Sequence, residues 1–178
     1  VPFGEYIPFR KYLDWIPPLS LVPRDMIRGT EEKIFQLENS KISTVISFEG
    51  AFQRYIRNGV KNGAEIVVVL TNQASYGLSA MSDQFILMSR ANAISNNRPI
   101  VHAAITGKSA FISNDGEILG QTRLFETITS IEKISGMTGL TLYTMFGNYL
   151  NLFIVLLSVL IYIIRKFNLR ADEKVNFS

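Results

Sequence analysis

Short apolar runs and amphipathic segments follow one another along residues 33–131. The short runs are rich in β-branched residues, as strands are, whereas the longer segments repeat apolar residues every three or four positions, as helices do. The predicted strands are 33–38, 41–48, 64–70, 99–105, 109–113, 117–120 and 124–131, and the predicted helices are 50–62 and 83–96. This order of strands and helices is typical of an α/β layer domain.

The same pattern predicts which residues are buried. The nearly continuous β-branched run at 64–70 is typical of a strand that is covered on both faces. In the second helix, Asp83 is placed to cap the first turn. The positions spaced for burial are Phe52, Tyr55, Ile56 and Val60 in the first helix and Leu87, Met88, Ala91 and Ile94 in the second.

A long apolar segment at 145–165 follows the predicted domain. Its length of about 20 residues is what a hydrocarbon core requires, and a basic cluster follows it. Because Lys and Arg gather on the cytoplasmic side, the pattern predicts one transmembrane helix, a cytoplasmic tail at 166–178 and an extracytoplasmic domain at 1–144. The alternative is a helix buried in a soluble core.

The composition excludes several kinds of site. The net charge of +3 is modest and the basic residues are scattered, so no nucleic-acid partner is expected. The chain has no cysteine and one histidine, which excludes disulfides and sites made of several cysteines or histidines. No metal and no cofactor are expected. His102 lies in a strand pattern, which predicts a half-buried or surface residue rather than a catalytic base.

Ser47 is the first candidate for chemistry. It ends the apolar run Thr44-Val45-Ile46, and a helical pattern begins directly after Phe48-Glu49. A turn between a strand and a helix can hold a nucleophile in the open while backbone N–H groups face the reacting atom. The sequence therefore predicts a nucleophile position at residue 47.

Four segments form an ordered series along nearly the whole chain. They are 1–9 (Val-Pro-Phe-Gly-Glu-Tyr-Ile-Pro-Phe), 46–49 (Ile-Ser-Phe-Glu), 98–107 continuing into 114–118, and 138–148, just before the apolar segment. The series resembles the motifs of the apolipoprotein N-acyltransferase family, which belongs to the nitrilase, or carbon–nitrogen hydrolase, superfamily. This resemblance implies an α/β fold, the C-terminal part of a nitrilase-like αββα sandwich followed by one transmembrane helix.

The resemblance also implies a reaction. Members of the family transfer an acyl chain from a phospholipid to the N-terminal cysteine amine of a lipoprotein through an acyl-enzyme, at the bacterial inner membrane. On this basis Ser47 takes the nucleophile position, and Glu49 and Glu5 match carboxylates near the active site. A helix-dipole contact for Glu49 and a salt bridge for Glu5 are the structural alternatives. The implied substrate-binding positions are Phe48, Asn72 and Tyr76.

Two departures from the family pattern leave the activity open. The family nucleophile is a cysteine, whereas this chain has Ser47, and an alcohol needs a strong and well-aligned base to ionise. The family's catalytic Glu and Lys lie upstream of Val1, so an N-terminal remainder of the same protein is expected as a partner. The chain is then either an N-acyltransferase acting through residue 47, or a catalytically inactive membrane-anchored paralogue or gene fragment that binds lipid or lipoprotein.

Overall fold

A computed structural model describes residues 3, 5–13, 15–27, 29 and 31–175, except for the side chains of residue 150 and of those from 167 onward. The strands are β1 (Ile34–Gln36), β2 (Lys41–Ile46), β3 (Ile66–Asn72), β4 (Ile100–Ile105), β5 (Ala110–Ile112) and β6 (Ile118–Gln121). The helices are α1 (Arg10–Leu13), α2 (Gln53–Lys61), α3 (Met81–Asn96), α4 (Leu142–Phe146) and α5 (Asn148–Val175), with short 3-10 turns η1 (Pro17–Leu21), η2 (Ser47–Ala51) and η3 (Ala74–Tyr76).

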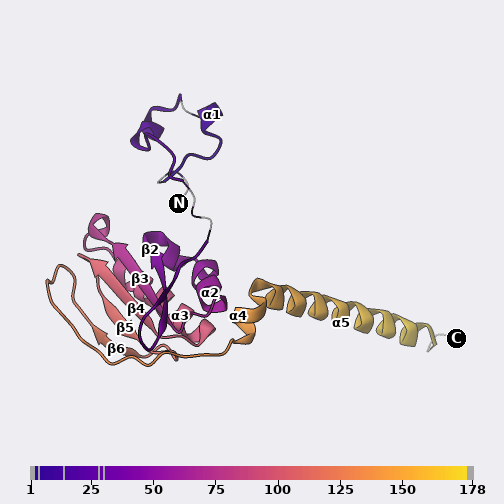
Figure 1. Ribbon diagram of the computed structural model, residues 1–178. Coiled ribbons are helices and arrows are strands. Elements are labelled where there is room, and N and C mark those ends of the chain that lie inside the picture. The colour runs from indigo at the N-terminus through magenta and orange to yellow at the C-terminus, as the bar shows by residue number, and fades with distance from the viewer. Residues whose placement is uncertain (1–2, 4, 14, 28, 30, 176–178) are drawn as a thin grey trace.

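The strands form one six-stranded sheet in the order β1-β2-β3-β4-β5-β6 (Figure 1). β2, β3 and β4 run parallel, and the outer pairs are antiparallel. The parallel strands need crossover connections, which α2 and α3 provide. This arrangement confirms the α/β fold that the sequence pattern predicts.

The hydrophobic core lies between the sheet and these two helices. Alternate strand residues such as Val45, Val67 and Val69 point toward the helices and are almost fully buried, together with Ile56 and Val60 of α2. Period-two alternation in a strand places every second side chain on one face, which is why a single row of each strand builds the core.

The opposite face of the sheet carries the other row of side chains. Ile46, Leu70 and Ile105 lie on that face, one near the carboxyl end of each parallel strand, and they are 63%, 44% and 65% exposed. Within the described residues, no second sheet covers this face. The strand at 64–70 was predicted to be covered on both faces, and only its helix side is.

Two further predictions are wrong. No strand forms at 124–131, where the chain leaves the sheet after β6 and continues without a ladder of hydrogen bonds to any neighbouring strand. In α3 the N-cap residue is Ala80, and Asp83 lies within the first turn, where its carboxylate pairs with Lys108.

The buried face of α3 also differs from the predicted one. Leu87 and Ile94 are 57% and 55% exposed, while the helix buries a partly polar face of Ser82, Phe85, Ile86, Ser89, Asn92, Ala93 and Asn96. Several of these polar groups have partners: Asn92 Nδ2 donates to the Gly50 carbonyl at 3.3 Å, and Asn96 Oδ1 accepts from Thr144 Oγ1 at 3.1 Å. Burial of a polar group is tolerated when such hydrogen bonds replace water.

The C-terminal arm, residues 138–146, is held against α2. Arg57 Nε donates to the carbonyls of Tyr143 and Thr144 at 3.2 and 2.9 Å, and its Nη2 donates to the Met145 carbonyl at 2.9 Å. Gly147, with φ +57°, separates α4 from α5, so the long helix begins at Asn148 rather than at 145. A Cβ at residue 147 would lie 2.8 Å from Arg57 Cζ, which explains the need for glycine at this position.

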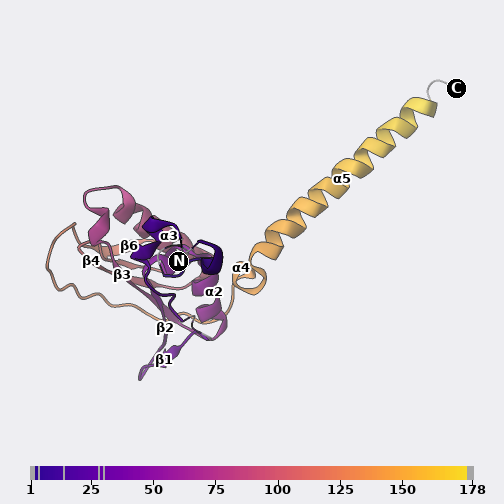
Figure 2. The ribbon, with the colours of Figure 1, turned by 90° about the horizontal axis from the view of Figure 1, so that it is seen from above.

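Figures 1 and 2 show α5 projecting away from the sheet. Its large apolar side chains between residues 152 and 164 are each between 42% and 64% exposed. Among the residues whose side chains are described, no helix combines the length and the apolar character of a membrane span. The transmembrane helix expected at 145–165 is therefore unconfirmed.

Candidate active site at the end of strand β2

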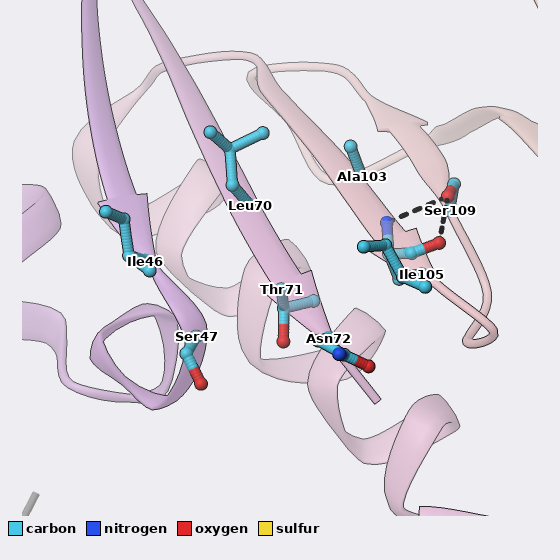
Figure 3. Close-up of a pocket in the computed structure, with 9 residues that line it drawn as sticks. Ile46, Ser47, Leu70, Thr71, Asn72, Ala103, Ile105 and Ser109 are labelled. Atoms are coloured by element: carbon cyan, nitrogen blue, oxygen red, sulfur yellow. Dashed lines mark hydrogen bonds between the residues drawn. The ribbon is translucent and has the colours of Figure 1, made fainter. Parts of the chain in front are cut away.

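Ser47 lies where the sequence predicts a turn between a strand and a helix. It follows the last residue of β2 and begins η2, with φ +55°. A residue with a side chain rarely adopts positive φ, and such strain costs on the order of 1–3 kcal/mol and gathers at functional sites. Figure 3 shows its hydroxyl beyond the carboxyl end of β2. The backbone therefore holds Ser47 in the position that a nucleophile takes at a turn between a strand and a helix.

A cavity of about 480 Å³ opens beside Ser47 at the carboxyl ends of the parallel strands (Figure 3). It is lined by Ile46, Ser47, Leu70, Thr71, Asn72, Ala103, Ala104, Ile105 and Ser109. The strand register aligns Ile46 with Leu70 and Leu70 with Ala103, which makes an apolar floor on the uncovered face of the sheet. The lining has no charged side chain. This pocket suits an apolar chain with a polar group near Ser47.

Glu49 stabilises the turn at Ser47 through a hydrogen bond to the backbone. Its Oε2 accepts a hydrogen bond from the Ile46 N–H at 2.8 Å, as an acidic residue in the first turn often does for the residue before the helix. Glu49 does not line the cavity. Its visible contact is thus structural, and a role in chemistry stays a prediction.

Phe48 and Tyr76 both pack against Phe85 of α3. Their ring centroids each lie 5.8 Å from that of Phe85 on α3, and the Phe52 ring lies 5.5 Å from that of Phe48. Neither Phe48 nor Tyr76 lines the cavity beside Ser47. The structure brings these two predicted substrate-binding residues together in an aromatic cluster behind the turn.

Of the other predicted site residues, Asn72 is in the cavity and Glu5 is not. Asn72 ends β3, and its Oδ1 accepts from the Ala74 N–H at 3.0 Å. Glu5 lines a separate cavity of about 470 Å³ with residues 21–26. Within the part of the chain that is described, no cluster of three or more acidic or histidine side chains could hold a metal ion.

The structure adds a buried polar network that the sequence pattern does not reveal. His102 is 1% exposed, so the predicted half-buried or surface position is wrong. Its Nδ1 lies 2.9 Å from Ser89 Oγ and its Nε2 lies 3.4 Å from Gln73 Nε2. If Gln73 donates to Nε2, the proton is on Nδ1 and is donated to Ser89. Because Gln73 follows Asn72, the buried imidazole steadies the edge of the cavity.

The burial of His102 predicts a pH dependence of stability. Desolvation lowers the pKa of His102 from 6.5 to about 4. As pH falls from about 6.5 to about 4, the unfolded chain binds a proton that the folded chain does not, and stability decreases by about 3 kcal/mol in total. We expect the urea midpoint to fall less between pH 7 and pH 4.5 in a His102→Asn variant than in the parent. Equal pH dependence of the two proteins would contradict this assignment.

Comparison with known proteins decides the family. The family model described as carbon-nitrogen hydrolase matches residues 6–141, which include the sheet, the Ser47 turn and the cavity. The chain belongs to the carbon-nitrogen hydrolase family. In this family member, the uncovered face of the sheet lies next to the candidate active site, because Ile46, Leu70 and Ile105 line the cavity beside Ser47.

Curated relatives of this carbon-nitrogen hydrolase family member are apolipoprotein N-acyltransferases. The chain is 31% identical over 153 residues to the one from Haemophilus ducreyi, which covers 84% of this chain and 30% of that protein. It is 30% identical over 176 residues to the one from Haemophilus influenzae, an alignment that covers 95% of this chain and 34% of that protein. It is 36% identical over 121 residues to the one from Aquifex aeolicus, with 67% of this chain and 26% of that protein covered. The chain thus spans about a third or less of the length of these relatives.

Solved structures agree on the fold. A cysteine-to-serine mutant of the Nesterenkonia AN1 amidase from the nitrilase superfamily superposes with a TM-score of 0.50 at 17% identity, over 62% of this chain and 44% of the amidase. At this identity the likeness concerns the fold alone. It confirms a nitrilase-like α/β arrangement and covers less than half of the solved chain.

Proposed function

We propose that this chain is the C-terminal part of an N-acyltransferase in which residue 47 carries the acyl group. The observation that supports this most is the strained turn at Ser47, with φ +55°, beside an apolar cavity of about 480 Å³. The curated relatives are named apolipoprotein N-acyltransferases. By their example, the donor is a phospholipid and the acceptor is the N-terminal cysteine amine of a lipoprotein.

The proposed reaction has two steps. Ser47 Oγ bonds to the carbonyl carbon of a phospholipid ester, the carbonyl electron pair moves to oxygen, and collapse breaks the bond to the glycerol oxygen, which takes up the hydroxyl proton through a base. The acceptor amine then attacks the acyl-enzyme, an amide forms, and Oγ regains a proton. No acid or base lines the described cavity, so the base is proposed to come from the upstream part of the protein.

The uncovered face of the sheet supports the proposal that an upstream part of the protein completes the site. Ile46, Leu70 and Ile105 give it an apolar surface that a second sheet of an αββα sandwich would cover. We therefore propose that an N-terminal remainder of the same protein packs here. That remainder would close the cavity and supply the family's Glu and Lys.

Anchoring in the bacterial inner membrane is part of the proposal. The exposed apolar side chains of α5 suit lipid. Ser158 Oγ donates to the Ile154 carbonyl at 2.8 Å, so this hydroxyl is satisfied within the helix and needs no water. The domain at 1–144 would be extracytoplasmic, with residues 145–165 as the span and the tail cytoplasmic. A tag after Ser178 that is reached from outside intact cells would refute this topology.

One observation favours a second candidate function. Serine replaces the family cysteine, and none of the nine residues around the cavity is titratable at neutral pH. An inactive membrane-anchored paralogue would keep the apolar cavity and bind lipid or lipoprotein without forming an acyl-enzyme.

A covalent adduct distinguishes the two candidates. The full-length protein, including its upstream sequence, would be placed in vesicles of phospholipid with isotopically labelled acyl chains, together with a diacylated lipopeptide that begins with cysteine. We expect mass spectrometry to find a labelled acyl group on residue 47 in the parent and in the Ser47→Cys protein, and none in the Ser47→Ala protein. An adduct in the cysteine variant but none in the parent would favour the inactive paralogue. Absence of adduct and of acylated lipopeptide in both the parent and the cysteine variant would overturn the N-acyltransferase proposal.

A further inference from the structure

We propose that the side-chain amide of Asn72 donates a hydrogen bond to the acyl carbonyl oxygen when an acyl chain is bound or attached at residue 47. This inference rests on the proposed function and adds a catalytic residue to it. Asn72 lies at the carboxyl end of β3, next to the end of β2 from which Ser47 follows. Both residues line the same cavity, and Figure 3 shows the Asn72 nitrogen on the side of Ser47.

The orientation of the amide is set by its own backbone. Asn72 Oδ1 accepts the Ala74 N–H at 3.0 Å, which is an Asx turn. Rotating the amide would direct an NH₂ group at that N–H, so the acceptor and donor ends are distinguished. Among the described residues, no group accepts a hydrogen bond from Asn72 Nδ2. A donor is therefore left for a ligand in the cavity.

The backbone that follows Asn72 is held in place. Gln73 is 3% exposed, and its N–H donates to the Ile105 carbonyl at 3.1 Å while its own carbonyl accepts from the Tyr76 N–H at 3.0 Å. A Cβ at residue 107 would lie 2.0 Å from Gln73 Oε1, so Gly107 makes room for this side chain. The donor at Asn72 is thus fixed before a ligand arrives, which is what makes such donors effective.

The apolar surroundings of the cavity increase the effect of this hydrogen-bond donor. The cavity floor is apolar and its lining has no charged group that could neutralise an oxyanion. In such a low-dielectric site, a neutral amide is a suitable partner for the negative charge that develops on a carbonyl oxygen under attack. Loss of one donor of this kind lowers the rate by on the order of a hundredfold.

Two substitutions separate the donor from the turn. Asn72→Asp keeps an oxygen for the Ala74 N–H but removes the NH₂ group, whereas Asn72→Ala removes both. The background is the full-length protein with Ser47→Cys in vesicles of phospholipid labelled with ¹³C at the acyl carbonyl. The readouts are the rate of adduct formation and the ¹³C=O stretching frequency of the acyl-enzyme in the infrared.

We expect both variants to form the adduct about a hundredfold more slowly. We also expect the carbonyl stretch to move to higher frequency in both, because a hydrogen bond to the oxygen is lost. A normal rate and frequency with Asn72→Asp but a slow rate with Asn72→Ala would show that Asn72 only holds the turn. A normal rate and frequency with Asn72→Ala but a slow rate with Asn72→Asp would show that the Asp charge alone is harmful. Either result overturns the inference and leaves the proposed function standing. Failure of the cysteine parent to form an adduct overturns both.

Discussion

Replacing Ser47 with cysteine in the full-length protein is expected to raise the rate of acyl-adduct formation by on the order of a hundredfold or more. A cysteine is a few per cent thiolate at neutral pH and is strongly nucleophilic, whereas a serine hydroxyl needs a base that removes its proton during attack. No lining residue of the cavity offers such a base. The two side chains have nearly the same shape, so the strained turn should be retained.

A single-turnover measurement with labelled phospholipid checks this prediction. Ser109→Cys is the matched control, because Ser109 lines the same cavity but its Oγ accepts the Ala104 N–H at 3.0 Å and lies on the other side of the cavity from residue 47. We expect an adduct at residue 47 and none at residue 109. Equal labelling of the two cysteines would mean that the cavity binds acyl groups without directing them to residue 47.

Replacing Arg98 with alanine is expected to destabilise the folded protein by about 3 kcal/mol or more. Arg98 is 2% exposed, and its guanidinium donates to the carbonyls of Ala64 and Asn97 at 2.8 Å each. It also donates to the carbonyls of Thr138 and Gly139 in the C-terminal arm. Removal would leave the buried Ala64 carbonyl and three partly buried carbonyls without this donor. A buried carbonyl that loses its partner costs about 1–3 kcal/mol before the structure relaxes, and the partly buried ones cost less.

Urea unfolding of the full-length protein would measure this loss. Arg90→Ala is the matched control, because Arg90 Nε makes one hydrogen bond, to the Gly116 carbonyl at 2.8 Å, at a partly buried site. We expect it to cost about 1 kcal/mol. Similar losses for the two variants would contradict the view that Arg98 joins the arm before α4 to the sheet. Arg98→Lys should recover only part of the stability, since an ammonium group cannot reach the same set of carbonyls in a plane.

The elements of the sheet were largely predictable from local sequence. Strands such as β3 and β4 have β-branched runs, and the turn at 114–116 between β5 and β6 has the Asn-Asp-Gly pattern of a hairpin. The expected strand at 124–131 failed for a physical reason. Alternation of apolar residues makes a segment suited to a sheet, but a strand exists only where a neighbour offers its hydrogen bonds.

The candidate site was predictable in part. The position of Ser47 follows from the order of strand and helix, and its positive φ agrees with a turn that presents a nucleophile. Phe48 and Tyr76, the implied substrate-binding residues, pack on Phe85, and their role in binding stays a prediction. Their aromatic character is the same in both places, so the sequence does not distinguish a binding residue from a packing residue.

The sequence by itself determined the family motifs, the succession of strands and helices along the chain, and the place of residue 47 at a turn, because these depend on neighbours along the chain. Only the tertiary structure decided that α3 buries Ser89 and Asn92 while Leu87 stays exposed, and that His102 is buried. Hydrophobic periodicity measures apolar character, whereas these burials depend on hydrogen bonds between residues far apart in the chain. For the same reason, only the structure showed that Asn72 presents an amide donor beside the turn where the sequence had placed Ser47.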